Sequence, residues 1–202
     1  NSETPFVSDL KGTGNIGIGT QALYLTTTGN ENVAIGNPNA MVSNTTGSLN
    51  TAIGSEVLKF NTTGNSNTCY GVSALQGNIS GSRNVAVGNG AGGINADTNK
   101  NTTGSSNTFL GTQAMPGSTT QRSFMTVIGA DAVGDRDNTV VLGRANDTVQ
   151  VVGGRILMTE QNAAVTPEAD QAVLYLDDNG SGKSRLMIQF ATGSPVQIAI
   201  QP

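Results

Sequence analysis

The chain has 202 residues, of which 36% are apolar and only 4% aromatic, so one large globular core would be hard to fill. The net charge is -4 and no cluster of Lys and Arg longer than a pair occurs, which argues against a nucleic-acid partner. The chain lacks histidine, the commonest general base, and its one cysteine, Cys69, excludes an intrachain disulfide and a cysteine-based metal site. No apolar run is long enough to insert into a membrane.

Residues 1–11 precede the first repeat and are interpreted as an N-terminal lead-in. From residue 12 onward a short motif recurs, which reads Asn-Thr-Ala-Ile-Gly at residues 50–54. The glycine that closes the motif returns after 17, 18, 17, 17, 23, 18 and 14 residues, at Gly19, Gly36, Gly54, Gly71, Gly88, Gly111, Gly129 and Gly143. A period in this range is typical of stacked coils, so residues 12–153 are predicted to form a β-solenoid.

The three residues before each closing glycine have the composition of a β-strand, with a β-branched residue, then a mostly small one, then a bulky apolar one. Successive strand residues face opposite sides, so the small and the bulky residue should point in opposite directions. We expect the bulky residues to fill the inside of the coil, at Ile18, Ile35, Ile53, Tyr70, Val87, Leu110, Ile128 and Leu142. We expect the small residues to pack closely against another copy of the chain, at Ala34, Ala52, Cys69 and Ala86.

A second apolar pair follows each closing glycine after three and four residues, as at Val57-Leu58, and predicts a second short strand. A second glycine, often within Thr-Thr-Gly, then turns the chain back. Both sides of the first strand are apolar, and a chain with so few expected helices has no other layer to cover the second side. The simplest cover is another copy packed about an axis parallel to the stack. A monomeric solenoid with a thin core is the alternative.

Two departures interrupt the repeat. The step from Gly88 to Gly111 is 23 residues rather than 17, and the six extra residues predict a loop that bulges from the coil. Loops on a rigid scaffold often carry binding residues, so Ile94, Asn95 and Asp97 are candidates for an exposed binding loop. A loop insertion without any function is the alternative. The second departure is Met125, which replaces the motif asparagine and predicts a register adjustment near the end of the stack.

Residues 154–202 differ in pattern from the repeats. Three apolar stretches near residues 174–176, 186–190 and 196–200 are separated by turn sequences. They predict a small antiparallel β-meander, which needs a further layer for stability. We therefore interpret this region as a C-terminal tip and trimerisation domain. Before it, Thr166-Pro167 predicts a short helical turn.

The repeat resembles two groups of known proteins. Residues 32–36 are a shortened form of the motif Asn-x-Val-Ala-Ile-Gly, and an Ala-Leu pair follows the motif in other coils. This pattern resembles the left-handed parallel β-roll of trimeric autotransporter adhesin heads of the YadA type. Thr-Thr-Gly-x-x-Asn-Thr-Ala-Ile-Gly at residues 45–54 is similar to repeats of bacteriophage tail fibres and related appendages. The resemblance covers about residues 12–143. Adhesin heads favour a shorter period, which only the last step of 14 residues matches.

The resemblance implies an all-β protein whose left-handed parallel β-roll shaft forms a homotrimer. It implies a structural and adhesive fibre of a bacteriophage tail, which is located on the virion, faces outward, joins other tail proteins and contacts a glycan or protein receptor on the host. A bacterial surface adhesin head is the alternative with the same fold. Alternatives of other classes are an ice-binding solenoid, whose ice-binding surface would be the stacked Thr-Thr pairs, and a glycan-cleaving tail spike.

Motifs that suggest chemistry are better explained by turns. Residues 88–93 satisfy GxGxxG, but no long helix follows them. Residues 177–182 imitate the first half of a calcium loop, but Ile188 stands where the loop needs a glutamate. The acidic group Asp131, Asp135 and Asp137 around Arg136 is typical of a solvated turn. We therefore assign no catalytic, cofactor-binding or metal-binding residue and predict that the chain is not an enzyme.

Overall fold

The structure is a computed structural model that describes residues 12–94, 96–145 and 147–148 and the strands at 172–178, 184–190 and 196–200. The chain divides into two compact units, Asn1–Val149 and Gln150–Pro202. Among the described residues, no helix is long and apolar enough to cross a membrane. The predicted lead-in at residues 1–11 and the helical turn at Thr166 lie outside the described residues.

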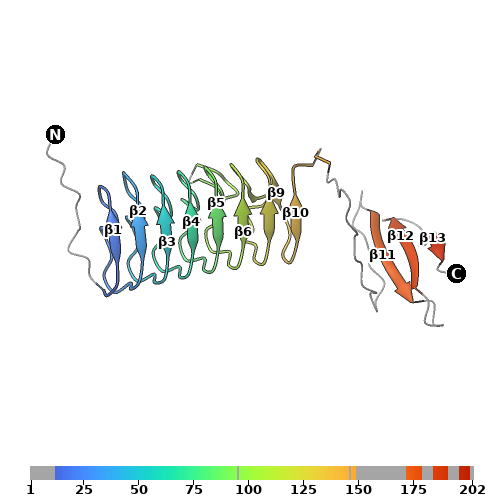
Figure 1. The fold of residues 1–202 in the computed structure, drawn as a ribbon, viewed down its shortest axis with the longest axis horizontal. Helices are drawn as coiled ribbons and strands as arrows, with labels where there is room; N and C mark the ends of the chain where they lie inside the picture. Colours follow the sequence, from blue (N-terminus) through green and yellow to red (C-terminus); the bar gives the residue numbers. More distant parts are fainter. Residues whose placement is uncertain are drawn as a thin grey trace. The chain divides into compact units, whose positions relative to one another are not determined.

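The first unit is a stack of coils with one strand per coil in an eight-stranded parallel sheet (Figure 1). The strands run in the order β1 (Ile16–Ile18), β2 (Val33–Ile35), β3 (Thr51–Ile53), β4 (Thr68–Tyr70), β5 (Val85–Val87), β6 (Thr108–Leu110), β8 (Thr126–Ile128) and β10 (Val140–Leu142). Their register aligns the sequence columns, so that Ala34 pairs with Ala52 and Ile35 with Ile53. The predicted β-solenoid and its first strand are confirmed.

The closing glycine of each coil lies directly beneath the next coil. A Cβ atom on Gly54 would collide with the carbonyl group of Gly71, and a Cβ atom on Gly71 would collide with that of Gly88. Gly54 also has a φ of 144°, which a residue with a side chain rarely adopts. Glycine is required here because stacked coils bring two backbones together at this corner.

The predicted second strand is present in only part of the stack. β7 (Met115–Pro116) and β9 (Val133–Gly134) form a two-stranded parallel sheet. In the earlier coils the corresponding residues form a turn, in which Leu58 and Leu75 have φ values of 49° and 47°. The Leu58 amide still donates to the Ala74 carbonyl at 2.9 Å, so this wall remains hydrogen-bonded from coil to coil. The prediction of a regular second strand is therefore wrong for these coils.

The small column of the sheet lies inside the coil. Ala34, Ala52 and Ala86 are fully buried, and Cys69 is 1% exposed. The opposite wall supplies the large side chains of the core, Leu23, Met41, Leu58 and Leu75, which are also buried. The coil is narrow, so a large residue on one wall leaves room for only a small residue on the strand that faces it.

The bulky column therefore lies outside, and our prediction that it fills the coil is wrong. Exposed members are Ile18, Tyr70, Leu110 and Leu142, and partly exposed members are Ile35, Ile53, Val87 and Ile128. The prediction that Ala34, Ala52, Cys69 and Ala86 contact another copy is wrong for the same reason, because these side chains are enclosed by their own coils. The alternation along the strand was correct, but the two sides were exchanged.

One pair of coils reverses the usual distribution of volume. Phe109 occupies the small column and is fully buried, whereas Gly92 occupies the position of Leu75 on the opposite wall. A Cβ atom on Gly92 would lie 3.3 Å from Cδ2 of Phe109 and 2.7 Å from Cδ2 of Leu75. The ring thus fills the space that a leucine fills in earlier coils. Core volume is conserved between walls rather than at a single position.

The second unit contains a three-stranded antiparallel sheet of β11 (Ala172–Asp178), β12 (Ser184–Phe190) and β13 (Val196–Ile200). Leu174 pairs with Ile188, and Ile188 pairs with Val196. A register shift separates Leu186 and Met187. The predicted antiparallel meander is confirmed, while its role as a tip and trimerisation domain stays a prediction.

Candidate interaction surface of the coil stack

The outward side of the eight-stranded sheet is the candidate functional surface, and we call it the outer face. It consists of the first and third residue of each strand, because the middle residue points inward. The first residues are Ile16, Val33, Thr51, Thr68, Val85, Thr108, Thr126 and Val140. The third residues are Ile18, Ile35, Ile53, Tyr70, Val87, Leu110, Ile128 and Leu142. No residue of either row is charged.

The outer face exposes large apolar side chains along the whole stack. Ile16 is 50% exposed at one end, Tyr70 is 60% exposed near the middle and Val140 is 68% exposed at the other end. Scattered apolar residues on a surface are ordinary, but a continuous uncharged strip of them marks an interaction site. This surface was missed because the bulky residues had been assigned to the core.

A ladder of asparagines, buried except for the partly exposed Asn15, fixes the position of the first six strands. The first asparagine ladder consists of Asn15, Asn32, Asn50, Asn67, Asn84 and Asn107, one residue before each of the first six strands. Oδ1 of Asn32 accepts hydrogen bonds from the backbone N and from Nδ2 of Asn50, both at 3.0 Å. Nδ2 of Asn50 also donates to the carbonyl of Gly64 at 2.9 Å. The motif asparagine therefore links successive coils.

A second asparagine ladder was not predicted. It consists of Asn44, Asn61, Asn78 and Asn101, each three residues before a turn glycine and each fully buried. Nδ2 of Asn61 donates to Oδ1 of Asn44 at 2.8 Å and to the carbonyl of Gly64 at 3.0 Å. The sequence signal for it is the repeated Asn-x-x-Gly spacing.

The first coil breaks the second asparagine ladder. Thr26 occupies the position that Asn44 occupies one coil later. Its Oγ1 atom is buried and has no hydrogen-bond partner. A hydroxyl group is too short to span the coil spacing as an amide does, so this step of the ladder is incomplete.

The threonine pairs are partly used by the stack itself. Oγ1 of Thr27 donates to the carbonyl of Thr45 at 3.0 Å, and Oγ1 of Thr45 donates to the carbonyl of Thr62 at 3.0 Å. The second residues of the pairs, such as Thr46, are exposed on the surface. The first threonine of each pair thus links coils, while the second forms an exposed row.

The predicted binding loop is closed by its own polar groups. The backbone N of Ile94 donates to Oδ2 of Asp97 at 2.8 Å, and Nζ of Lys100 donates to the carbonyl of Asp97 at 3.1 Å. Ile94 and Asp97 are half-buried, and Asn95 lies outside the described residues. The exposed residues beside them are Ala96 and Thr98. The polar group of Asp97 therefore has a structural partner, and the binding role of the loop stays a prediction.

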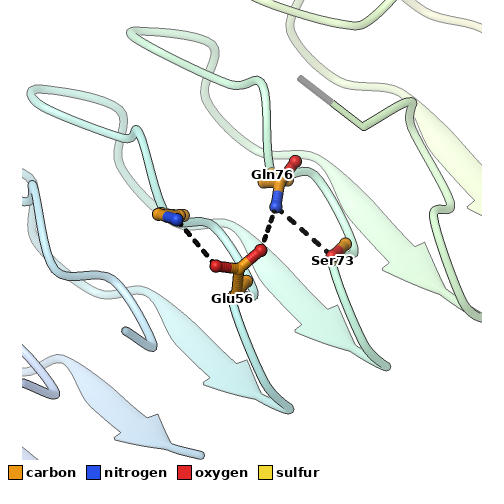
Figure 2. A network of polar contacts seen from close by, with 4 residues as sticks. Glu56, Ser73 and Gln76 are labelled. Carbon is orange, nitrogen blue, oxygen red and sulfur yellow. Dashed lines mark hydrogen bonds and ion pairs between the residues drawn. The ribbon is translucent and has the colours of Figure 1, made fainter. Parts of the chain in front are cut away.

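Glu56 is the centre of a polar network on the wall opposite the sheet (Figure 2). Its Oε1 atom accepts from Nζ of Lys59 at 2.7 Å, and its Oε2 atom accepts from Nε2 of Gln76, one coil further on, at 2.7 Å. Nε2 of Gln76 also lies 3.3 Å from Oγ of Ser73. The hydrogen bond from Lys59 lowers the pKa of Glu56, so this carboxylate stays ionised and links two coils.

Groups that could support chemistry are held in structural positions. Burial raises the pKa of the Cys69 thiol, which keeps it protonated and unreactive. Within the described residues, no group of three His, Cys, Asp or Glu side chains is arranged to hold a metal ion. Among the described residues, the outer face is therefore the candidate for a functional surface.

Comparison of the chain with protein-family models, with curated proteins and with solved structures gives no match.

Proposed function

We propose that the chain is a structural and adhesive segment of a homotrimeric fibre in a bacteriophage tail, either a tail fibre or a related virion appendage with left-handed coils. In this role it faces the outside of the virion, joins other tail proteins and holds or forms a surface that contacts a glycan or protein receptor on the host. The observation that carries the proposal is the uninterrupted stack of eight parallel strands, of which the first six are linked by asparagine ladders.

This architecture suits a part that spans distance. Neighbouring strands lie about 4.8 Å apart, so every added coil lengthens the stack by a fixed step. Coil-to-coil bonds such as Asn67 Nδ2 to Asn50 Oδ1, at 3.0 Å, are buried and resist bending of the stack. The similarity of residues 45–54 to repeats of phage appendages supports the same role.

A bacterial trimeric adhesin head remains the alternative with the same coils. An ice-binding solenoid and a glycan-cleaving tail spike are the alternatives of other classes. Use of the Thr27 and Thr45 hydroxyl groups within the stack favours a structural role for this threonine row over ice binding.

The test is to locate the chain on its particle. Antibodies raised against the purified chain are applied to phage particles and to bacteria from the source culture and viewed by electron microscopy. Gold labelling of a tail appendage is expected. Labelling of the bacterial surface without labelling of particles would contradict the proposal and support an adhesin head. Assays of ice recrystallisation and of polysaccharide cleavage by the same protein test the other two classes, and activity in either would also contradict it.

A further inference from the structure

We infer that the last two coils of the stack, residues 112–143, open and close as a unit that the side chain of Gln121 holds against the six coils before it. We call these residues the terminal coils. The inference goes beyond the proposed function and does not depend on it, because it concerns the stability of coils within one chain. Opening lengthens the chain between the closed part of the stack and the unit that begins at Gln150.

Both asparagine ladders end before the terminal coils. Their last members are Asn107 in the first ladder and Asn101 in the second. Met125 occupies the next position of the first ladder, and its backbone N still donates to Oδ1 of Asn107 at 2.9 Å. Its side chain has no amide group that could bind the coil that follows. The one asparagine among residues 112–143 is the exposed Asn138, so no buried asparagine links the two terminal coils.

The side-chain bonds of the terminal coils are closer to solvent than those of earlier coils. The Ser123 amide donates to Oδ1 of Asp137 at 2.8 Å at an exposed site, where water can replace the carboxylate. The corresponding bond between Asn67 N and Oδ1 of Asn50, at 2.9 Å, is buried. Opening the terminal coils therefore breaks bonds that water can replace, which makes it less costly than opening the coils before them.

The two ends of the stack also differ in their cores. In the first coil, Leu23 is 1% exposed and fills the coil from the wall opposite the sheet. In the last coil, Ala132 is fully buried, but Val141, at the inner position of the sheet, is only partly buried. A segment with little buried apolar surface opens at a lower free energy than the rest of a protein. We therefore expect opening at this end and not at the other.

Gln121 makes the link between the sixth coil and the terminal coils. In an earlier coil, the amides of Thr45 and Thr46 donate to the backbone carbonyl of Thr62, at 3.0 and 3.1 Å. The amides of Thr102 and Thr103 donate instead to Oε1 of Gln121, at 2.6 and 3.0 Å. A backbone carbonyl is fixed by its coil, whereas a glutamine side chain gains rotamer freedom when it leaves. This corner can therefore open without a change in the backbone.

A second observation at the same place favours opening. Nε of Arg122 is buried, and no atom of the described residues accepts a hydrogen bond from it. A buried N–H group without an acceptor is unfavourable, and water satisfies it once the coil opens. The terminal coils thus begin with a removable link and a polar group that is better satisfied in the open form.

The first experiment measures hydrogen exchange of the unaltered chain by mass spectrometry of peptides that contain β1, β3 or β8. The amides of Ile16, Thr51 and Thr126 each donate to a carbonyl of the next coil at 2.8 Å, so the lengths of their hydrogen bonds are equal. Differences in exchange then report opening of the coils. We expect β8 to exchange at least about tenfold faster than β1 and β3. Exchange of β8 no faster than that of β3 overturns the inference. Equally fast exchange of β1 and β8 also overturns it, because both ends would then simply fray.

The second experiment tests the link. Gln121→Ala is expected to speed the exchange of β8 and β10 about fivefold and to leave that of β3 unchanged. Gln113→Ala is the matched control, because Gln113 binds the preceding coil through its backbone N, which donates to the Asn89 carbonyl at 2.9 Å. It is expected to leave all three rates unchanged. The inference fails if Gln121→Ala leaves the exchange of β8 unchanged or speeds that of β3 by the same factor.

Discussion

The inner and outer sides of the eight-stranded sheet differ in a way that a globular core does not show. The inner side carries Gly17, three alanines and one cysteine in the first five coils, and the outer side of the sheet carries Ile, Leu, Val, Thr and Tyr. In a globular protein the larger side chains of a sheet usually point to the core. Here the coil is too narrow for large residues on both walls, so the larger apolar side chains of the sheet point outward. The comparison teaches that residue size alone does not identify the buried side of a strand in a solenoid.

The largest effect is expected when the same charge is placed on each side of one strand, which tests which side faces the core. Ala52→Asp puts a carboxylate into the fully buried core, where no cation can reach it, and is expected to lower the free energy of unfolding by about 4 to 5 kcal/mol. Ile53→Asp puts it on the partly exposed outer side and is expected to leave the coil folded. Circular dichroism during urea unfolding measures both. Greater loss of coil structure in Ile53→Asp than in Ala52→Asp would contradict the assignment of sides.

A second test exchanges volume between the two walls. Phe109→Ala is expected to cost about 3 to 4 kcal/mol, because it leaves a cavity in a fully buried position. Gly92→Leu alone is expected to destabilise as well, since its side chain would collide with Leu75 and Phe109. The double variant restores the arrangement of earlier coils and should be more stable than the sum of the two losses implies. Thermal unfolding of all three proteins measures the losses in stability. If the loss in the double variant equals the sum of the two single losses, the two side chains do not occupy the same space.

The asparagine ladders can be compared with an asparagine outside them. Asn67→Ala removes the acceptor of the Asn84 backbone N, at 3.0 Å, inside the stack and is expected to cost about 2 to 3 kcal/mol. Asn65→Ala changes the same kind of residue at an exposed site, where water can replace the acceptor of the Ser48 amide. We expect it to cost under about 1 kcal/mol. If urea unfolding shows equal losses in the free energy of unfolding for the two variants, burial does not determine how much an asparagine of the ladder contributes to stability.

The smallest expected effect is a gain in stability. Thr26→Asn places an amide where the second asparagine ladder is incomplete, and the side chain can then reach the carbonyl of Gly29 as Asn44 reaches that of Gly47 at 2.9 Å. We expect an increase of about 1 kcal/mol in the free energy of unfolding. Thr28→Asn, two residues later on the exposed surface, is the control and should change little. A loss of stability in Thr26→Asn would show that the ladder cannot be extended to the first coil.

Much of the fold follows from the sequence. The spacing of Gly19, Gly36 and Gly54 indicates the coils, and the three residues before each glycine form the strands in the expected register. The terminal meander follows from alternation alone. These features are local, because each depends on residues that lie within one repeat.

The assignment of the two sides could not be made in this way. Alternation shows that Ala52 and Ile53 point in opposite directions, but it does not show which of them points inward. That depends on the width of the coil, which Leu58 and Leu75 set from the opposite wall. The partner of Asn44 in the second asparagine ladder likewise lies one full coil away, at Asn61, and is not visible within one repeat.

The reactivity of Cys69 in separated chains tests the assignment of sides most directly. The measurement uses the Ile53→Asp variant, or any sample that light scattering shows to be monomeric, and follows the reaction of its single thiol with a colorimetric disulfide reagent. If Cys69 lies inside its own coil, the thiol stays unreactive in the folded monomer and reacts only after unfolding in urea. If the small column instead forms the contact between copies, Cys69 reacts as soon as the chains separate, and the assignment of the two sides is contradicted.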